Sequence, residues 1–161
     1  HFNKQATRYD TIRDRIGDTG LAVVYANLVG GQDELVFDGA SFVMNGDSEV
    51  VAQCPAWQEG VFYVELAGDT CSGPKHALPA EEEAVYEALV LAVRDYVGKN
   101  GFPGALIGLS GGIDSALTLA IAVDARGAGR LRPGALVLMA GIGAGLTWGA
   151  ALLEWTGGRS S

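Results

Sequence analysis

The sequence predicts an α/β protein, and three observations carry this prediction. Two stretches with helical spacing of apolar residues, at 5–16 and 80–98, are separated by short β-branched runs. An apolar run at 104–110 leads straight into a pair of glycines and then into a third helical pattern. A glycine-rich apolar tail begins at residue 134. Helical and strand-like segments mixed in this way are typical of α/β architectures.

The N-terminal half predicts one helix and a small sheet. The helical pattern at 5–16 meets a stop at the Thr-Gly pair 19–20. The run LAVVYANLV (21–29) is nearly continuously apolar and β-branched, which predicts a strand that is covered on both faces. Three more strand-like runs are separated by turn residues, and we expect successive hairpins from LVFDGASFVMN (35–45), SEVVAQC (48–54) and GVFYVEL (60–66).

The C-terminal half predicts a linker, a long helix and a strand–turn–helix unit. Residues 68–79 have the composition of a linker. The helix expected at Ala80–Gly98 begins with three glutamates, which suit the positive end of a helix dipole. GALIGLS (104–110) has the pattern of a buried strand, and a short helix is expected at 114–125. The apolar stripe of the long helix consists of Val85, Leu89, Ala92, Val93 and Tyr96.

Two interpretations are open for the tail. Residues 135–153 are uncharged, and this run has about the 20 residues that a membrane-spanning helix needs. Glycines repeat in it at four-residue spacing, as they do in closely packed membrane helices. The segment GIGAG (141–145), however, divides the run into two pieces of strand length. A buried β-hairpin is therefore the preferred interpretation.

Composition excludes some classes of partner. The chain has 19 acidic and 11 basic residues and a net charge of −8, without a stripe of lysine and arginine that would bind nucleic acid or an anionic membrane. Cys54 and Cys71 lack metal-ligand spacing and do not suggest a disulfide framework. We expect two free thiols and a cytoplasmic location, and the polar N-terminal stretch shows no secretory signal.

The turn SGGIDS (110–115) has the residue types that bind phosphate. Two adjacent glycines leave main-chain N–H groups open to an anion at the start of a helix. The serine hydroxyls can donate to phosphate oxygens, and the aspartate can cap the helix or hold a Mg²⁺ that bridges phosphates. The lysine of a GxxxxGK[ST] loop is absent, which excludes the ordinary nucleoside-triphosphatase site. The candidate residues are Ser110, Gly111, Gly112, Asp114 and Ser115, with Asp114 as the candidate metal ligand.

These residues carry a family resemblance. SGGIDS after an apolar strand resembles the pyrophosphate-binding loop of ATP pyrophosphatases with an adenine-nucleotide α-hydrolase-like fold. The runs EEEAVYEALVLAVRDYV and KNGFPGALIGLSGGIDSALTLAIAVDA resemble the start of the synthetase domain of glutamine-dependent NAD synthetases. Residues 4–57, which include GGQDELVFDG, resemble the C-terminal part of the nitrilase-like glutaminase domain of the same family. The resemblance covers residues 1–126.

The resemblance implies a carbon–nitrogen ligase. Such an enzyme adenylylates the carboxylate of nicotinic acid adenine dinucleotide with ATP and Mg²⁺, releases pyrophosphate, and then admits ammonia from glutamine to give NAD. The five loop residues above would bind ATP and its pyrophosphate. The domains implied are the C-terminal part of the glutaminase domain at 1–67, a linker at 68–79 and the start of the ATP pyrophosphatase domain at 80–126. No catalytic residue is assigned, because the Glu-Lys-Cys triad of the family lies upstream of the matched segment.

The tail resembles a different family. Residues 129–156, which contain GALVLMAGIGAGLTWGAALLEW, resemble the C-terminal hairpin of β-ketoacyl-acyl-carrier-protein synthase III, which has a thiolase-like fold. The chain then joins two fragments near residue 128, with 127–161 as the hairpin segment. We expect it to be a partial, inactive synthetase, with the hairpin covering the exposed face of the incomplete sheet. The alternatives are a structural fragment of the synthase III type and a small protein anchored in a membrane through 135–153. Homo-oligomer formation is left open.

Overall fold

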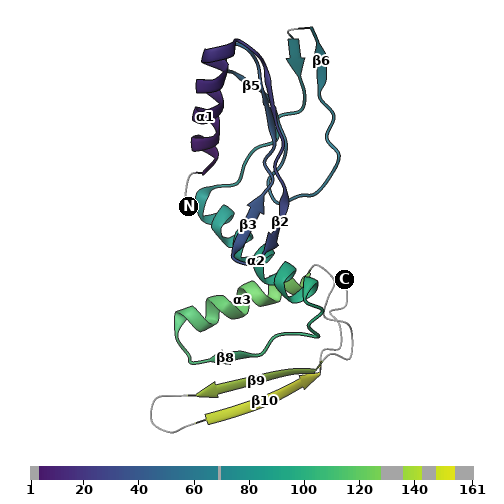
Figure 1. Ribbon diagram of the computed structural model, residues 1–161. Helices are drawn as coiled ribbons and strands as arrows, with labels where there is room; N and C mark the ends of the chain where they lie inside the picture. Colours follow the sequence, from purple (N-terminus) through teal and green to yellow (C-terminus); the bar gives the residue numbers. More distant parts are fainter. Residues whose placement is uncertain (1–3, 69, 128–135, 143–147, 155–161) are drawn as a thin grey trace. The chain divides into compact units, whose positions relative to one another are not determined.

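The computed structural model describes residues 4–68, 70–127, 136–142 and 148–154, which form three helices and ten strands (Figure 1). The chain divides into two compact units, His1–Ala88 and Leu89–Ser161. The predicted α/β class is confirmed. The helices are α1 (Lys4–Thr19), α2 (Glu81–Lys99) and α3 (Ile113–Gly127). The strands are β1 (Val23–Tyr25), β2 (Val29–Gln32), β3 (Leu35–Asp38), β4 (Phe42–Met44), β5 (Val50–Gln53), β6 (Glu65–Ala67), β7 (Thr70–Ser72), β8 (Ile107–Leu109), β9 (Leu136–Ile142) and β10 (Trp148–Glu154).

The first unit is built on helix α1 and an antiparallel sheet in the order β1-β4-β5. The helix ends where the sequence predicts: Gly20 has a φ of 69°, and its N–H donates to the carbonyl oxygen of Ile16 at 2.7 Å. A left-handed glycine after the last turn is a common way to end a helix. Figure 1 shows α1 lying along the sheet.

The core of the first unit lies between α1 and the sheet. Ile16, Phe42 and Met44 are fully buried there. The ring of Phe42 meets Tyr9 edge-on, with 4.8 Å between the ring centroids, and stacks on Tyr25 at 5.0 Å. A second buried cluster on the sheet consists of Val43, Ala52 and Cys71, so β7 packs against β4 and β5.

The prediction of one continuous strand over residues 21–29 is wrong. The segment forms β1 in the three-stranded sheet and β2 in a separate hairpin with β3. Leu21 and Leu28 lie outside both strands and are about two-thirds exposed, at 66% and 67%. The apolar run is divided because Asn27, between β1 and β2, makes side-chain hydrogen bonds to Asp38 and Gly39, which turn the chain away from the first sheet.

The later hairpins also differ from the prediction. Residues 60–64 form no strand, and β6 begins only at Glu65. Its partner β7 lies in the segment predicted as a linker at 68–79. This segment is held to β5 by main-chain hydrogen bonds in which Gln53 donates to Pro74 and His76 donates to Gln53. Glycines and prolines at 68–79 therefore mark tight turns of an ordered segment.

The helices at 80–98 and 114–125 are confirmed as α2, which includes the boundary between the two units at residues 88 and 89, and as α3, which lies in the second unit. The apolar stripe of α2 is only partly covered, however: Tyr96 is 58% and Leu89 42% exposed, whereas Ala92 and Val93 are half-buried, and the buried residue of this helix is Leu91. Strand β8 is shorter and less buried than predicted, because Ile107 and Leu109 are half-buried and Gly108 is exposed.

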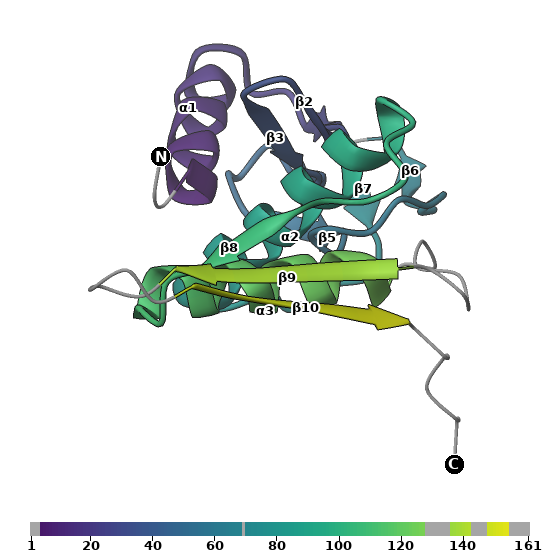
Figure 2. The ribbon, with the colours of Figure 1, turned by 90° about the horizontal axis from the view of Figure 1, so that it is seen from below.

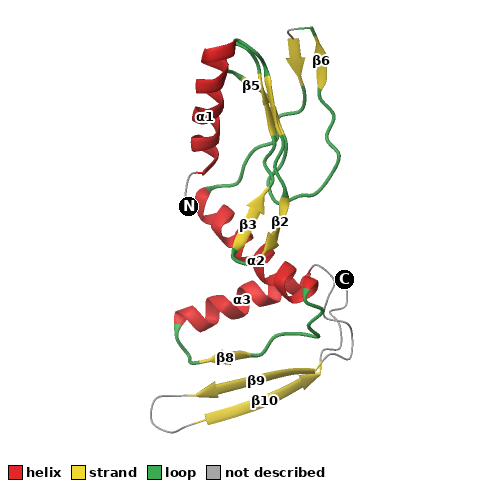
Figure 3. Ribbon diagram, viewed as in Figure 1, coloured by secondary structure: helices red, strands yellow, loops and turns green. Residues whose placement is uncertain are grey.

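The tail forms the predicted hairpin. Strands β9 and β10 are antiparallel from Leu136↔Glu154 to Ile142↔Trp148, and the turn between them lies outside the described residues. The membrane-helix interpretation of 135–153 is wrong for both strands, and among the described residues no helix is long and apolar enough to cross a bilayer. We had expected the hairpin to cover a face of the sheet, and this expectation is wrong. Strand β9 pairs edge-to-edge with β8, and the order is β10-β9-β8 (Figures 2 and 3).

The core of the first unit generates a prediction. Phe42→Ala removes a fully buried ring between two tyrosines and should lower the free energy of unfolding of this unit by about 3–5 kcal/mol. The control Val24→Ala lies in the same sheet at a position that is 55% exposed, and it should cost less than about 1 kcal/mol. Hydrogen exchange of the β4 amides measures both values. Equal losses in the two variants would contradict this core.

Candidate functional site

The loop of residues 110–112 joins the end of β8 to the start of α3. Gly111 has a φ of 81°, in the left-handed region that favours glycine. A Cβ atom built at Gly111 would meet no atom within 4 Å. The glycine is therefore required by the backbone conformation and not by close packing. The loop is exposed at Ser110, Gly111 and Gly112.

Two serine hydroxyls make hydrogen bonds within this turn. The hydroxyl of Ser115 donates to the carbonyl oxygen of Gly112 at 2.9 Å and accepts the N–H of Ser110 at 3.3 Å. The hydroxyl of Ser110 accepts the N–H of Gly112 at 3.4 Å and lies 3.3 Å from the hydroxyl of Ser115. The structure thus brings together Ser110, Gly112 and Ser115, as the sequence predicts. Their hydroxyls hold the turn in this structure.

Main-chain donors remain open at the start of α3. Within the described ranges, the N–H groups of Gly111, Ile113 and Asp114 have no protein acceptor. The first bond of the helix is made later, when the N–H of Ala116 donates to Gly112 at 3.2 Å. Unpaired N–H groups and the helix dipole together favour an anion at this position. The exposed side chain of Ile113, at 83%, flanks these donors.

Asp114 is the candidate metal ligand, and it lies on the first turn of α3. Its side chain is exposed and makes no ion pair or hydrogen bond with the described residues, while its carbonyl oxygen accepts the hydroxyl of Thr118 at 2.8 Å. In the described ranges no group of three or more histidine, cysteine or acidic residues could hold a metal. A lone carboxylate fits a Mg²⁺ that is held mainly by phosphates and water.

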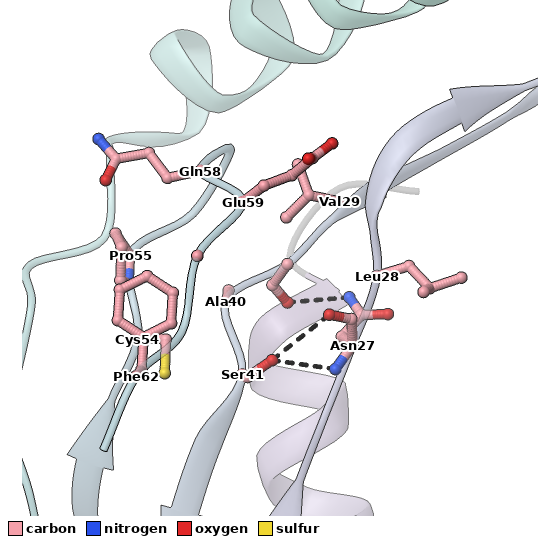
Figure 4. A pocket seen from close by; sticks show the side chains of 12 residues that line it. Asn27, Leu28, Val29, Ala40, Ser41, Cys54, Pro55, Gln58, Glu59 and Phe62 are labelled. Carbon is pink, nitrogen blue, oxygen red and sulfur yellow. Dashed lines mark hydrogen bonds between the residues drawn. The ribbon is translucent and has the colours of Figure 1, made fainter. Parts of the chain in front are cut away.

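The first unit has a cavity that the sequence did not indicate. Its volume is about 310 Å³, and it lies between the chain before β2, the turn after β3 and the segment after β5 (Figure 4). Ser41 accepts the main-chain N–H of Asn27 at 2.9 Å inside it. The lining residues are Asn27, Leu28, Val29, Gly39, Ala40, Ser41, Cys54, Pro55, Gln58, Glu59, Gly60 and Phe62.

The wall of this cavity is fixed by an ion pair and a strained turn. Arg8 contacts both carboxylate oxygens of Asp38, at 2.8 and 2.9 Å. The next residues are left-handed, with φ values of 69° at Gly39 and 50° at Ala40. A Cβ at Gly39 would lie 2.6 Å from Cγ2 of Val29. The pair Asp38-Gly39 was predictable as a turn, but the partner Arg8 lies 30 residues away in the sequence and was not.

The comparisons with known proteins fall into two groups. The family model of the 3-oxoacyl-[acyl-carrier-protein] synthase III C-terminal domain matches residues 99–155. Curated relatives are glutamine-dependent NAD(+) synthetases: that of Rhodobacter capsulatus is 49% identical over 73% of this chain, and that of Acinetobacter baylyi is 45% identical over 80%. The chain spans only 22% and 24% of these two relatives.

A solved structure agrees with the curated relatives. It is that of the glutamine-dependent NAD+ synthetase from Acinetobacter baumannii in complex with adenosine diphosphate, with a TM-score of 0.74 and 42% sequence identity. The match covers 89% of this chain and 26% of that protein. The predicted resemblance to glutamine-dependent NAD synthetases is confirmed.

The synthase III resemblance is confirmed as well, but over a longer range than predicted. The family model begins at residue 99, whereas the predicted tail begins at 129. The loop Ser110–Ser115 lies within this range and also within the range that we predicted to resemble NAD synthetase. Only 104 of the 161 residues lie outside 99–155, which is less than the 73% of the chain matched by the Rhodobacter capsulatus synthetase. That match must therefore include some residues of 99–155. The two resemblances therefore overlap.

Cys54 lines the cavity in the part that resembles NAD synthetase, and its chemistry is testable. Both cysteines are free thiols, as predicted. Burial raises the pKa of the Cys54 thiol, so at pH 8 a smaller fraction is thiolate than in a free cysteine. Iodoacetamide should therefore modify Cys54 several times more slowly in the native chain than in urea, and the native rate should rise with pH. Mass spectrometry of the Cys54 peptide measures this, and a faster native rate would show an activated thiol instead.

Proposed function

We propose that this chain carries the ATP- and pyrophosphate-binding loop of a glutamine-dependent NAD synthetase. One observation carries the proposal: open N–H groups at the start of α3 lie at a left-handed glycine turn, in a chain 42% identical to a synthetase that was solved with adenosine diphosphate. Gly111 would present an open main-chain N–H group together with Ile113 and Asp114, and Gly112 would add its own once that N–H leaves the hydroxyl of Ser110. Ser110 and Ser115 would exchange their internal hydrogen bonds for phosphate oxygens.

The chemistry that this loop would support is adenylyl transfer. In the proposed reaction, ATP adenylylates the carboxylate of nicotinic acid adenine dinucleotide, and ammonia then displaces AMP to give NAD. Negative charge develops on the departing pyrophosphate, and N–H groups that already point outward stabilise it without reorganising. Asp114 would hold Mg²⁺ against the phosphates, because its carboxylate alone would repel them. We assign no proton-transfer residue to this chain.

The division of the chain follows from the same proposal. Residues 1–67 would be the C-terminal part of the glutaminase domain, 68–79 the connection and 80–126 the start of the synthetase domain. Residues 127–161 would be the thiolase-like hairpin segment. The complete reaction would require the glutaminase triad and the remaining nucleotide pocket, which the matched quarter of the relatives' length does not supply. The proposal for the residues of this chain is therefore limited to nucleotide binding.

A second candidate function is a structural role of the synthase III type. The observation that favours it is the family-model match over residues 99–155, which covers β8, α3 and the hairpin. In that case the loop at 110–112 would be a helix-capping turn without a ligand. Calorimetric titration with ATP and Mg²⁺ separates the two candidates, since a flat titration of the full chain would remove the first.

The conformation of Gly111 provides a sharper test. Gly111→Ala forces an alanine into the left-handed region, which costs about 1–2 kcal/mol and should weaken ATP binding by about tenfold. The control Gly104→Ala lies in the same unit, without a positive φ and with nothing within 4 Å of its Cβ, so its ATP affinity should not change. Equal affinities of both variants and the parent would show that the loop does not bind the phosphates.

The role of Asp114 is tested by changing the metal. Asp114→Asn removes a metal ligand, so affinity for ATP with Mg²⁺ should fall by about tenfold. With EDTA in place of Mg²⁺, the same variant should bind ATP at least as well as the parent, because a negative charge near the phosphates is gone. Calorimetry at both conditions gives the comparison. A loss of the same size with and without Mg²⁺ would contradict metal binding by Asp114.

A further inference from the structure

We infer that strand β9 of the tail supplies the parallel neighbour on which the phosphate-binding turn depends. The inference rests on the proposed function and goes beyond it, because it makes a segment that resembles another protein family a working part of the nucleotide site. The observation behind it is the register of β8 with β9, which is Ile107↔Met139, Gly108↔Ala140 and Leu109↔Gly141. The last of these pairs immediately precedes Ser110.

Strand β8 needs this partner. It has three residues, and among the described strands it pairs with β9 alone. Main-chain N–H and C=O groups without a partner are costly when removed from water, and a single short strand does not hold its conformation. The pairing to Gly141 therefore fixes the point from which the turn at 110–112 leaves the sheet. Without β9, the hydrogen bonds of Ser110 and Ser115 would still close the turn, but the strand end that orients the N–H groups at Gly111 and Ile113 would no longer be held in place.

The connection between the two strands completes a known kind of unit. Parallel strands require a crossover, and here α3 provides it, in contact with β8. Figures 1 and 2 both show α3 running alongside β8. In parallel sheets with such crossovers, ligands bind outside the carboxyl ends of the strands. The turn at 110–112 lies at the carboxyl end of β8, and Gly141 is the β9 residue paired with the last residue of β8.

The match to the solved synthetase extends into the tail. Residues 1–126 are 126 of 161 residues, about 78% of the chain, yet the structural match covers 89%. Part of the tail therefore also follows the backbone of that protein. By sequence, residues 99–155 match the synthase III family model. The structural match to the synthetase and the sequence match to the synthase III family model thus both include residues of the tail.

The experiment compares two substitutions of the same kind in the full chain. Gly141→Pro places proline in the central strand β9, next to β8, whereas Gly149→Pro places it opposite Gly141 in β10, which is the edge strand of the described sheet. Proline is poorly tolerated in a central strand and far better at an edge, so exchange of the amides at 107–109 should rise by about tenfold or more in Gly141→Pro alone. ATP affinity should fall by a similar factor in that variant and stay within about twofold in Gly149→Pro.

The outcomes distinguish this inference from the proposed function. If the parent chain does not bind ATP, the proposed function fails, while the exchange of residues 107–109 still decides whether β9 supports β8. If the parent binds ATP and the two proline variants behave alike in both measurements, the inference is overturned. Exchange of the β4 amides in the first unit shows whether either variant has unfolded the whole chain.

A disulfide test needs no disruptive substitution. Neighbouring strands lie about 4.7–4.9 Å apart, within the Cα range of a disulfide, whereas strands two positions apart do not. The double variant Gly108→Cys/Ala140→Cys places two cysteines at opposite residues of β8 and β9, and these two should readily form a disulfide. Gly108→Cys with Ala150→Cys reaches one strand further and should not, because Ala150 lies opposite Ala140 in β10. Peptide mapping locates the bond, and cross-linking of the second pair alone would overturn the register.

Discussion

The left-handed conformation of Gly111 is the constraint on which the candidate site depends. A chain that leaves a strand and enters a helix within three residues must reverse its direction, and here the reversal requires a φ of 81°. Because a side chain is strained in that conformation, glycine occurs there, and the N–H groups around it remain uncovered. The hydrogen bonds of the Ser110 and Ser115 hydroxyls depend on the same geometry, because they close the turn at Gly112.

The first unit is stabilised by core packing and by one buried, hydrogen-bonded amide. One face of its sheet packs on α1 through Phe42, and a buried amide joins the helix, the strained turn and β5. The side chain of Gln53 donates to the carbonyl oxygens of Ala40, Ser41 and Cys54, and its own oxygen accepts the hydroxyl of Tyr9. Because each polar atom of Gln53 has a partner, its burial is tolerated. This network positions the wall of the cavity.

The sequence predicted the local elements better than their burial. Helices α1, α2 and α3, the strand–turn–helix order and the tail hairpin all follow from periodicity and from glycine positions, which act over a few residues. The division of residues 21–29 into two strands could not be predicted in this way, because it depends on Asn27 bonding to Asp38 and Gly39. The exposure of Leu89 and Tyr96 on α2 was also missed, since an apolar stripe shows which face of a helix could be buried and not whether anything covers it.

Sequence separation explains why the loop at 110–115 was predictable and the pairing of β8 with β9 was not. Residues Ser110 to Ser115 are consecutive, so their types alone indicate an anion-binding turn, and their mutual hydrogen bonds span at most five residues. The pairing of Leu109 with Gly141 joins residues 32 positions apart, and neither glycine spacing nor apolar patterning selects it over other registers. Another segment with a short apolar strand after α3 could occupy that position, because main-chain hydrogen bonding does not depend on side-chain identity. The residue types of β9 therefore do not identify its partner, and the pairing with β8 is seen only in the folded chain.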